Sequence, residues 1–532
     1  MANRNLLGAL ISVALICGMT LIGCKTPPPA AEPEKPVDNT IHSVSISLSD
    51  GDAPKVGEEL TAAVKNKDGS SVSGVSYQWK RGDSPDGTFE NIDNAASSRY
   101  TPVIEDAGKY IKVEAENSST SAPVESVAVG PAVGDQVAKP EADIVDEDVV
   151  PGQEITLASA TENAVIYYTL DGTTPTSDST AYDSDSKLQI TSNCTLQALA
   201  TRDGMVDSEI LSVTYSVVPP PSFSSVTSSA PIFSAGIFSA AYGNNRFVAG
   251  GNVAIAYSAN GTTWTQAAGA DASFSGFGLV RGIVYGKQFV AVGYNSSGGA
   301  INYSSDGASW NGVTTTTFGA SYINDVAYGS EKYVAVGKDG KMAYSSDGKT
   351  WTAVSDSTFG TSEIIGITYG AEKFIAVGVR GKMAYSDDGT TWTAVSDSAF
   401  GTYMINGVTY GGAPDKERFV AVGGSLGPCR IAYSTDGITW TSVSQDISVD
   451  SVGNLNRVVW DGSRYVAVAA SGVMLFSLDG TYWARIDGGT DAGKSQFGTD
   501  SYINDIVCGG EKLLAVGSKN SSLDRGEMAI SK

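Results

Sequence analysis

The chain has 532 residues, a formal net charge of −23 and a single histidine, His42. A chain this acidic offers no basic surface to displace counterions from nucleic acid, so its charge argues against nucleic-acid binding. One histidine nearly excludes histidine-based catalysis and metal sites built from several histidines. The length predicts several domains, and 61 glycines with only 17% charged residues are typical of a turn-rich all-β chain.

The first 23 residues form an apolar leader with a positive start at Arg4. Its apolar stretch is too short and too weakly flanked to predict a stable membrane span. The leader ends Leu-Ile-Gly-Cys at Cys24, which resembles a bacterial lipobox. The resemblance implies a signal peptide over 1–23, acylation of Cys24 and a lipid anchor in the cell envelope, at the outer membrane or cell surface. The alternative is a plain secretory signal with a chance cysteine.

Residues 24–40 are rich in proline and predict an extended tether. Beyond the leader the cysteines are Cys194, Cys429 and Cys508, which are far apart and have no zinc spacing. We expect them to be small buried side chains rather than a disulfide framework. The sequence predicts no metal and no cofactor.

Residues 41–134 alternate between apolar and polar side chains in the manner of strands. Tyr77-Gln78-Trp79 and the later segment Asp106-Ala107-Gly108-Lys109-Tyr110 resemble a bacterial Ig-like domain. The resemblance implies a β-sandwich with Trp79 in its core and a corner at the Asp-x-Gly-x-Tyr unit. The cysteine pair of antibody domains is missing, so Trp79 must pack without a bridge.

Arg81-Gly82-Asp83 lies between Trp79 and a predicted strand at Phe89, which predicts a projecting loop. The tripeptide resembles the integrin-binding loop of fibronectin, and that resemblance implies a host receptor as a partner. The alternative is ordinary turn chemistry, because polar loops of this composition are common.

Residues 139–217 predict a second sandwich. The segment 165–175, Val-Ile-Tyr-Tyr-Thr-Leu-Asp-Gly-Thr-Thr-Pro, resembles the β-sandwich found C-terminal to chitobiase and β-hexosaminidase catalytic domains. That module is accessory in those enzymes, so the resemblance implies no hydrolase here. Four nearby acidic residues offer oxygens that suit Ca²⁺, but they lack a calcium-loop spacing, which favours solvated turns; they are Asp171, Asp178, Asp183 and Asp185.

Residues 221–532 repeat the phrase Tyr-Ser-x-Asp-Gly-x-x-Trp. Complete copies span 303–310, 344–351, 385–392 and 433–440, and weaker copies span 257–264 and 476–483. One unit predicts four strands, at Ile323–Tyr328, Lys332–Gly337, Lys341–Ser345 and Thr350–Val354. Runs such as 374–377 are apolar on both faces, so each sheet must lie between two others. Radially packed sheets satisfy this requirement, and the segment is predicted to be a β-propeller.

The repeat count predicts seven blades. Six full copies end at Trp483, and a seventh begins at Tyr502 but stops before a fourth strand. The segment from Phe223 copies the fourth strand that follows Trp351, with Phe in place of Trp. We therefore predict that Phe223 begins a strand beside Met528 that closes the ring and leaves no exposed sheet edge.

The repeated hairpin resembles the Asp-box of sialidase-type propellers, although it is one residue shorter before its glycine. In one copy we expect Asp347 to accept backbone N–H groups, Gly348 to adopt positive φ and Trp351 to pack between blades. Repeated residues serve a repeated fold, so we interpret the hairpins as structural rather than as six binding sites.

Insertions such as 294–299 fall mainly on the face that carries the connections between blades, and variable loops on a rigid scaffold commonly carry function. One repeat position at the mouth of the innermost strand holds Asn324, Asn406, Asn456 and Asn504, while other blades have Phe238, Arg281 and Ile365 there. An asparagine ring with Arg281 suits a polar ligand such as a sugar. The alternative, which the repetition favours, is that each Asn bonds neighbouring backbone and holds the blades in register.

Recurring Phe-Gly pairs precede the inner strands, and we expect them to pack over the blade tops rather than form an aromatic rim. They begin at Phe277, Phe318, Phe359, Phe400 and Phe497.

Together these features predict a membrane-anchored, non-enzymatic binding or adhesion protein whose ligand is a glycan or a host or envelope protein. The alternatives are a sialidase-like glycoside hydrolase and an envelope assembly scaffold. A sialidase requires an arginine triad, a Tyr/Glu pair and an acid. Its Phe/Tyr-Arg-Ile-Pro element is absent, and only Arg281, Arg430 and Arg457 are expected near the variable face. Fold alone does not carry the activity across.

Overall fold

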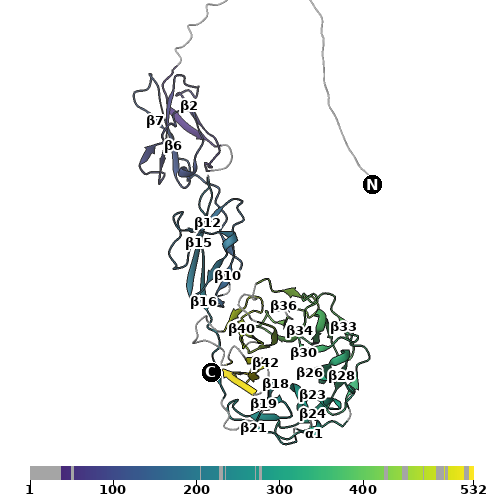
Figure 1. The fold of residues 1–532 in the computed structure, drawn as a ribbon. Helices are drawn as coiled ribbons and strands as arrows, with labels where there is room; N and C mark the ends of the chain where they lie inside the picture. The colour runs from purple at the N-terminus through teal and green to yellow at the C-terminus, as the bar shows by residue number, and fades with distance from the viewer. Residues whose placement is uncertain are drawn as a thin grey trace, which may run out of the picture. The chain divides into compact units, whose positions relative to one another are not determined.

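The structure is a computed structural model that describes residues 38–48, 53–145, 147–203, 205–226, 232–233, 235–269, 271–274, 278–314, 316–424, 429–445, 453–470, 472–486, 497, 501–519 and 526–531. The predicted leader, Cys24 and nearly all of the tether lie outside these residues. The described chain is almost entirely β, as predicted, with one short helix, α1 (Asp271–Phe274) (Figure 1). None of its helices is long and apolar enough to cross a membrane.

The chain divides into two compact units, one with residues 1–136 and 202–206 and the other with 137–201 and 207–532. The first unit holds two facing sheets. One has the order β1–β2–β5 (Ser43–Ser47, Leu60–Lys65, Arg99–Tyr100), and the other β4–β3–β6–β7 (Phe89–Asn91, Ser76–Gly82, Tyr110–Glu116, Val124–Glu125). The turn η1 (Ile104–Asp106) precedes β6. Trp79 is fully buried in this core, as predicted, and its indole N–H donates to the Ser97 carbonyl at 2.8 Å.

The prediction of a projecting loop at Arg81-Gly82-Asp83 is wrong for its first two residues. Both belong to β3, which continues because it is paired on both sides, with β4 and with β6. The Arg81 guanidinium lies 3.2 Å from the buried carboxylate of Asp106, and Asp83 forms an ion pair with Lys109. Arg81 therefore stabilises the sandwich instead of standing on a loop.

The second unit begins with another set of sheets. A five-stranded sheet has the order β13–β12–β15–β16–β9 (Thr180–Ala181, Val165–Thr169, Cys194–Thr201, Leu211–Val217, Asp148–Val149). Two separate strand pairs lie in the same part of the chain. They are β10–β14 (Gln153–Ile155, Leu188–Ile190) and β11–β8 (Leu157–Ala158, Glu141–Ala142), and the turn η2 spans Ser184–Ser186. Asp171 accepts the Thr173 N–H at 3.0 Å and Asp183 accepts the Asp185 N–H at 3.0 Å, so both carboxylates cap local turns.

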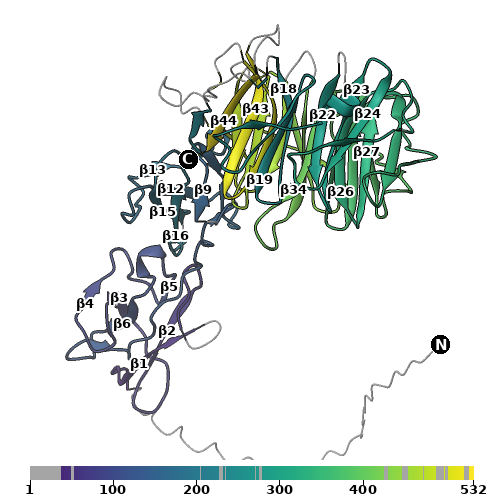
Figure 2. The same ribbon diagram turned by 90° about the horizontal axis from the view of Figure 1, so that it is seen from below.

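The rest of the second unit is a propeller of four-stranded antiparallel sheets, seven in the part that the structure describes (Figures 1 and 2). Blade 1 is β18–β21 (Ile237–Gly243, Arg246–Gly251, Ile255–Ser258, Thr265–Gln266). Blade 2 is β22–β25 (Leu279–Tyr285, Phe289–Asn295, Gly298–Ser304, Asn311–Gly312). Blade 3 is β26–β29 (Ile323–Gly329, Lys332–Gly337, Met342–Ser345, Thr352–Ala353). Blade 4 is β30–β33 (Ile364–Gly370, Lys373–Gly378, Met383–Ser386, Thr393–Ala394).

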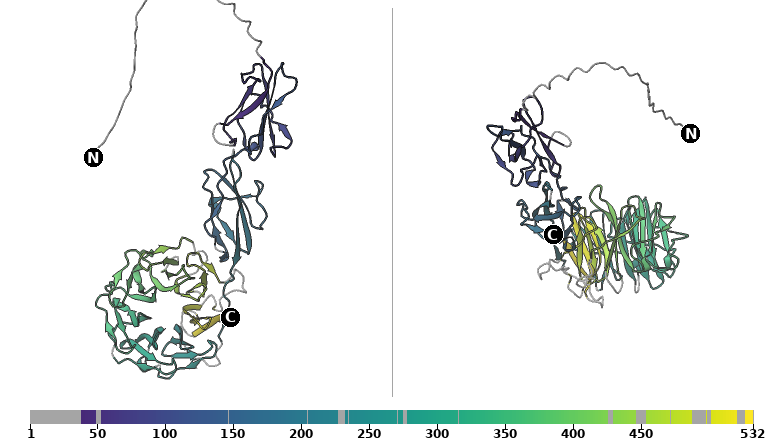
Figure 3. Two further views of the ribbon diagram at one scale, coloured as in Figure 1. Left: turned by 180° about the vertical axis from the view of Figure 1, so that it is seen from behind. Right: turned by 90° about the horizontal axis from the view of Figure 1, so that it is seen from above.

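Blade 5 is β34–β37 (Ile405–Gly411, Arg418–Gly423, Arg430–Ser434, Thr441–Ser442), and blade 6 is β38–β41 (Leu455–Trp460, Tyr465–Ala469, Met474–Ser477, Ala484–Arg485). Blade 7 joins β42–β44 (Ser501–Gly509, Lys512–Lys519, Gly526–Ser531) to β17 (Phe223–Ser225). Single turns η3 (Lys338–Gly340) and η4 (Val379–Gly381) follow the second strands of blades 3 and 4. The first strand of each blade contacts the first strand of the next, and β42 contacts β18, so these inner strands surround the central axis of the ring, which we call the tunnel (Figure 3).

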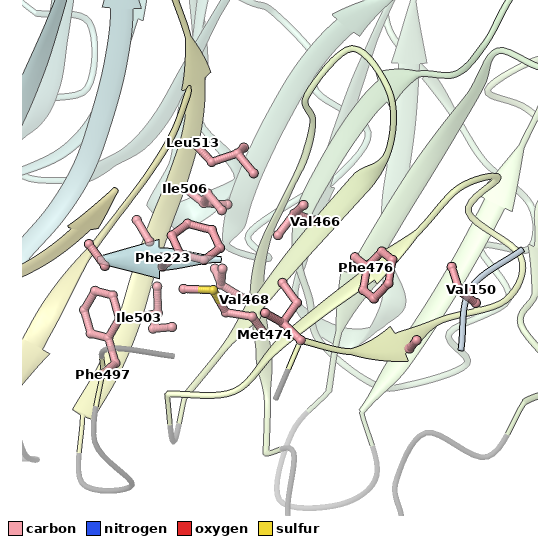
Figure 4. Packing of buried hydrophobic residues seen from close by; sticks show 14 residues of the cluster. Val150, Phe223, Val466, Val468, Met474, Phe476, Phe497, Ile503, Ile506 and Leu513 are labelled. Atoms are coloured by element: carbon pink, nitrogen blue, oxygen red, sulfur yellow. The ribbon is translucent and has the colours of Figure 1, made fainter. Parts of the chain in front are cut away.

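The predicted closing strand is present. Phe223 pairs with Ser531 and Ser225 with Ala529, and the Val226 N–H donates to the Met528 carbonyl at 3.0 Å. The Phe223 side chain is buried in a cluster of blade 6 and 7 residues that includes Ile503 and Val468 (Figure 4). Val150 of the preceding sandwich belongs to the same cluster. Closure is therefore supported by apolar packing as well as by strand pairing.

The repeated hairpins have the expected mechanics. Asp347 Oδ1 accepts the N–H groups of Lys349 and Thr350, both at 2.8 Å, and Gly348 has φ of 70°. Trp351 is buried among residues of blades 2 and 3. The side chains of the Phe-Gly pairs are buried, which agrees with packing over the blade tops; those in the described chain are Phe318, Phe359, Phe400 and Phe497.

Candidate functional site

Residues that depart from the repeat gather at one end of the tunnel. We call the end at which the inner strands begin the loop face, and the opposite end the turn face. Every inner strand has a β-bulge one residue after its first buried apolar residue. A bulge adds one residue to a strand and re-aims its side chain. The next position along carries glycine in three blades, at Gly282, Gly366 and Gly407. The other four blades have Ser239, Asp325, Arg457 and Asp505 there.

Three charged side chains of that position meet inside the tunnel. Arg457 of blade 6 places Nη1 3.1 Å from Asp325 Oδ2 of blade 3 and Nε 3.6 Å from Asp505 Oδ1 of blade 7. The same Nη1 donates to the Asn406 carbonyl at 3.2 Å. The three charged side chains are only 17, 13 and 12% exposed. We call this set the tunnel triad, and it joins blades on opposite sides of the ring.

Backbone groups complete the tunnel triad. Asp505 Oδ2 accepts the Ala240 N–H at 2.9 Å, and Asp325 Oδ2 accepts the Ile367 N–H at 3.1 Å, in each case from the next blade. Burial raises the pKa of Asp505 to about 6, against the opposing effect of Arg457, and burial also raises the pKa of Asp325. One guanidinium shared between two buried carboxylates leaves the second carboxylate poorly compensated.

Glycine makes room for the arginine. A Cβ at Gly366 would lie 3.2 Å from Arg457 Nη1, and one at Gly407 would lie 3.0 Å from the Arg457 Cα. A side chain at Gly366 would therefore compete with the guanidinium for space, and one at Gly407 would press on the Arg457 backbone. The glycines of blades 4 and 5 therefore leave the space that the Arg457 side chain of blade 6 occupies.

The asparagine ring connects blades. The amides of Asn406, Asn456 and Asn504 each donate at 2.8 Å to a backbone carbonyl of the next blade, at Leu455, Ile503 and Ile237. Asn324 does the same to Ile364 at 2.8 Å. These are the hydrogen bonds expected if each Asn bonds neighbouring backbone and holds the blades in register. The β-bulge explains them because it turns each side chain toward the neighbouring blade.

Asn324 also links two charged residues. Its Oδ1 accepts a hydrogen bond from Arg281 Nη1 at 2.8 Å, and its Nδ2 donates to Glu363 Oε1 at 2.9 Å. The structure therefore brings together Arg281 and Asn324, two residues predicted from the sequence as ligand-binding. Asn406, Asn456 and Asn504 belong to the other side of the ring.

Two cationic side chains, one of them Arg281, and two aromatic rings lie together on the loop face. Tyr294 and Tyr322 stack with ring centroids 4.0 Å apart and an interplanar angle of 21°. The Arg281 guanidinium lies 5.8 Å from the Tyr294 centroid, and Lys338 Nζ lies 5.5 Å from the Tyr322 centroid. We call these four residues the mouth ladder. Cations over ring faces hold both partners in place.

Tyr294 belongs to the mouth ladder because residues that are expected to form a loop form part of a strand pair. The insertion 294–299 is expected to be a variable loop, but Tyr294 pairs with Gly299 and Asn295 with Gly298. The second strand of blade 2 therefore extends beyond that of blades 1 and 3 to 6. The extension carries the Tyr294 ring to the level of Tyr322. Backbone pairing on this hairpin gives the aromatic pair a fixed position.

Two tyrosines of the loop face are exposed at equivalent repeat positions. Tyr322 and Tyr502 each precede an Ile-Asn-Asp sequence that enters the tunnel, and each is 38% exposed. In the described propeller the only other large apolar side chain with comparable exposure is Ile438. Exposed aromatic side chains around a rigid concavity are typical of recognition surfaces.

Sequence reasoning missed Tyr294, Tyr322, Lys338 and the tunnel triad. The signal for the triad was present, since Asp325, Asp505 and Arg457 replace glycine at one repeat position. The three arginines considered for a sialidase have different partners. Arg281 bonds Asn324, Arg457 lies between two aspartates, and the Arg430 guanidinium lies 4.2 Å from the Tyr403 ring centroid.

Comparison with known families supports the two kinds of domain. Residues 146–212 match the family described as chitobiase/beta-hexosaminidase C-terminal domain, and residues 258–428 match the family described as DUF6242 beta propeller domain. Each match covers less than half of the chain. A search of curated proteins finds no match.

Solved structures that resemble the chain are propellers of low sequence identity. "YCF48 bound to D1 peptide" is 13% identical with a TM-score of 0.43, over 59% of this chain and 99% of that chain. "YCF48 from Cyanidioschyzon merolae" is 14% identical with a TM-score of 0.43, over 58% and 98%. The WD40 beta propeller domain of Doa1 is 8% identical with a TM-score of 0.42, over 59% and 96%. The chain is thus an all-β protein with a sandwich similar to a carbohydrate-related family and a propeller, an organisation that fits a binding or scaffold role.

Proposed function

We propose that this chain is a non-enzymatic binding protein of the cell envelope, held by a lipid on Cys24, whose propeller binds a glycan or protein ligand at the loop face. The observation that carries the proposal is the pair Tyr322 and Tyr502, exposed at equivalent positions on the rim of the tunnel. The mouth ladder gives one half of this rim a fixed aromatic surface. A rigid surface binds with little loss of side-chain entropy.

The composition of the loop face favours binding over catalysis. The buried carboxylates of the tunnel triad are engaged with Arg457 and with backbone N–H groups. Most glycosidases use two carboxyl groups on either side of a sugar bond, with one free to donate a proton. The similarity of residues 146–212 to a module of carbohydrate-active enzymes supports a glycan as the ligand.

A binding experiment tests the proposal. The full-length protein in detergent is applied to an array of glycans and extracellular proteins, and Tyr322→Ala and Tyr502→Ala are compared with Tyr303→Ala. Tyr303 is a half-buried tyrosine in the third strand of blade 2, away from this rim. We expect both rim variants to lose retention of the same ligand and the control to keep it. Retention unchanged in both rim variants would contradict the loop face as the binding surface.

Two further measurements separate the alternatives. Release of sugar from reporter glycosides by the unmodified protein would favour the hydrolase, and co-purification of a defined envelope complex would favour the scaffold. Incorporation of labelled palmitate into the protein, lost in Cys24→Ser, tests the anchor.

A further inference from the structure

We propose that Asn260 is a modification site, where the side-chain amide is lost as ammonia while the propeller ring is open and is retained once the ring is closed. The reaction is deamidation through a cyclic imide, and its co-reactant is water. The site is independent of the ligand that the propeller binds.

Asn260 is the exception among the repeated hairpins. Blade 1 carries Asn260 followed by Gly261, whereas the hairpins of blades 2 to 6 carry aspartate before their glycine, at Asp306, Asp347, Asp388, Asp436 and Asp479. An asparagine before a glycine is the arrangement most prone to deamidation, because no side chain on the next residue hinders attack by its backbone nitrogen. Asn260 is exposed, so water reaches it.

The reaction needs two groups of this hairpin. The Gly261 backbone nitrogen attacks Cγ of Asn260 and forms a carbon–nitrogen bond, and the side-chain nitrogen leaves as ammonia with the proton that Gly261 gives up. Water then opens the five-membered imide at one of its two carbonyls. One opening yields aspartate. The other yields isoaspartate, in which the backbone runs through the side-chain carbon and is one methylene longer.

The closed structure withholds both reacting groups. The Gly261 N–H donates to Ser258 Oγ at 2.9 Å, and Ser258 is buried. Asn260 Oδ1 accepts the N–H groups of Thr262 and Thr263 at 3.0 and 2.9 Å. These bonds direct the Asn260 side chain toward the residues after Gly261, so attack by the Gly261 nitrogen requires the hairpin to open.

Blade 7 covers this hairpin. A Cβ added at Gly261 would lie 2.2 Å from Ile530 Cδ1, so the Ile530 side chain packs on the glycine backbone. Ile530 belongs to β44, where it pairs with Ser224 of the closing strand and is buried. In blades 2 to 6 the hairpin glycine packs on an earlier blade, as Gly348 does on Val290 of blade 2. Only the blade 1 hairpin is covered by the last strand of the chain, so Asn260 gains this protection when the ring closes.

The two products differ in their effect on the fold. Aspartate at this position fits the hairpin, since the same turn holds aspartate in blades 2 to 6. Isoaspartate lengthens the backbone just before Gly261, and the close approach of Gly261 to Ile530 leaves no room for the shift. A chain that stays open long enough to form isoaspartate therefore cannot close its ring as the unmodified chain does.

Peptide mass spectrometry of the full-length protein tests the inference, with two other Asn-Gly pairs as internal controls. They begin at Asn311 in β25 and at Asn406, whose amide donates to the Leu455 carbonyl at 2.8 Å, and neither lies at the junction of blades 1 and 7. The mass increase at each site is followed over time at mildly alkaline pH. We expect Phe223→Ala, which loosens the closing strand, to speed deamidation of Asn260 at least about tenfold, in proportion to the open population. Asn406 should change little.

A second variant separates protection from catalysis. Ser258 Oγ lies 3.1 Å from Asn260 Oδ1 as well as beside the Gly261 N–H, a position from which a hydroxyl is also able to relay a proton. If Ser258 protects the site, Ser258→Ala speeds deamidation of Asn260 about three- to tenfold, the equivalent of one hydrogen bond. Ser304→Ala is the matched control, because Ser304 accepts the Gly307 N–H in the blade 2 hairpin in the same way. It should leave the rate at Asn260 unchanged.

Three results would overturn the inference. They are equal acceleration of Asn260 and Asn406 in Phe223→Ala, slower deamidation of Asn260 in Ser258→Ala, and deamidation of Asn260 that is no faster in the urea-unfolded chain than in the folded one. If Phe223→Ala does not fold, the original protein in urea below its unfolding midpoint gives the same comparison between the two sites. On refolding, chains with isoaspartate should be depleted from the folded fraction, and their full recovery would contradict the effect on closure.

Discussion

The Arg457 guanidinium of blade 6 lies 3.1 Å from the Asp325 carboxylate of blade 3, across the tunnel. Most contacts in a propeller join a blade to its immediate neighbours, whereas this one spans the ring. It also places three charged side chains inside the tunnel. The tunnel triad therefore affects both stability and the shape of the candidate site.

Replacing Arg457 should be strongly destabilising. Arg457→Met leaves two buried carboxylates without their cation, and breaking a buried ion pair from one side costs about 3–5 kcal/mol. Urea unfolding of the full chain measures the loss. The triple variant Arg457→Met, Asp325→Asn, Asp505→Asn should recover much of it because no buried charge remains. An Arg457→Met protein as stable as the original would contradict this account.

The raised pKa of Asp505 should appear in the pH dependence of stability. The folded-state pKa of about 6 exceeds the value of 3.8 for an unperturbed aspartate, so the folded protein binds more protons between these two pH values. The associated stabilisation is present below pH 4 and is lost as the pH rises through 6. Asp505→Asn should therefore gain stability relative to the original between pH 4 and 7, by at most about 3 kcal/mol. Equal pH profiles would exclude this role.

The hairpin aspartates should show the opposite sign. At Asp436 partial burial disfavours the charge, but the N–H groups of Thr439 and Ile438 lower its pKa to about 2. Its contribution to stability is present above pH 4 and is lost as the pH falls toward 2. Asp436→Ala should cost about 1–2 kcal/mol in unfolding at pH 7. Asp436→Asn should cost less, as Asn260 bonds Thr262 and Thr263 in the same way in blade 1.

A glycine on the turn face should be intolerant of any side chain. A Cβ at Gly411 would lie 2.2 Å from Trp460 Cγ of the next blade. At the junction of blades 6 and 7 the equivalent residues are Asp461 and Cys508, so a side chain there faces a smaller partner. We expect Gly411→Ala to lower the melting temperature by several degrees. Adding Trp460→Cys should reverse part of the change, and failure of both effects would show that the contact can relax.

Removing the side chain that seats the closing strand should weaken the ring. Phe223 is 7% exposed within the cluster shared by blades 6 and 7. Phe223→Ala should cost about 3–5 kcal/mol through lost burial and the cavity left behind. Ser225→Ala, on the same strand and exposed, is the control and should change stability little. Amide exchange in β44 should rise in the first variant alone.

The repeat predicted the propeller because each copy carries its own strand and turn signals. Residues 332–337 form the expected second strand, whereas the fourth strand shrinks from 350–354 to Thr352–Ala353 since the Asp347 turn takes up the residues before it. The strand at Arg81 was missed because its length depends on two neighbouring strands.

The candidate site was predictable only in part. Asn324 and Arg281 were found from their repeat position. The mouth ladder, however, requires the Tyr294 and Tyr322 rings to stack, and this depends on the length of the β23–β24 hairpin. The ion pair between Arg457 and Asp325 depends on which side chain crosses the tunnel. Local sequence specifies neither the position of the Tyr294 ring relative to Tyr322 nor that of Arg457 relative to Asp325.

The pairing of Phe223 with Ser531 joins residues about three hundred positions apart within one sheet. Phe223 leaves the ribosome long before Ser531 is added, so blade 7 forms only after synthesis of the chain is complete. Until then blades 1 and 6, which flank the gap, expose the apolar faces that blade 7 later covers. If the chain is exported unfolded, the ring must assemble on the far side of the membrane.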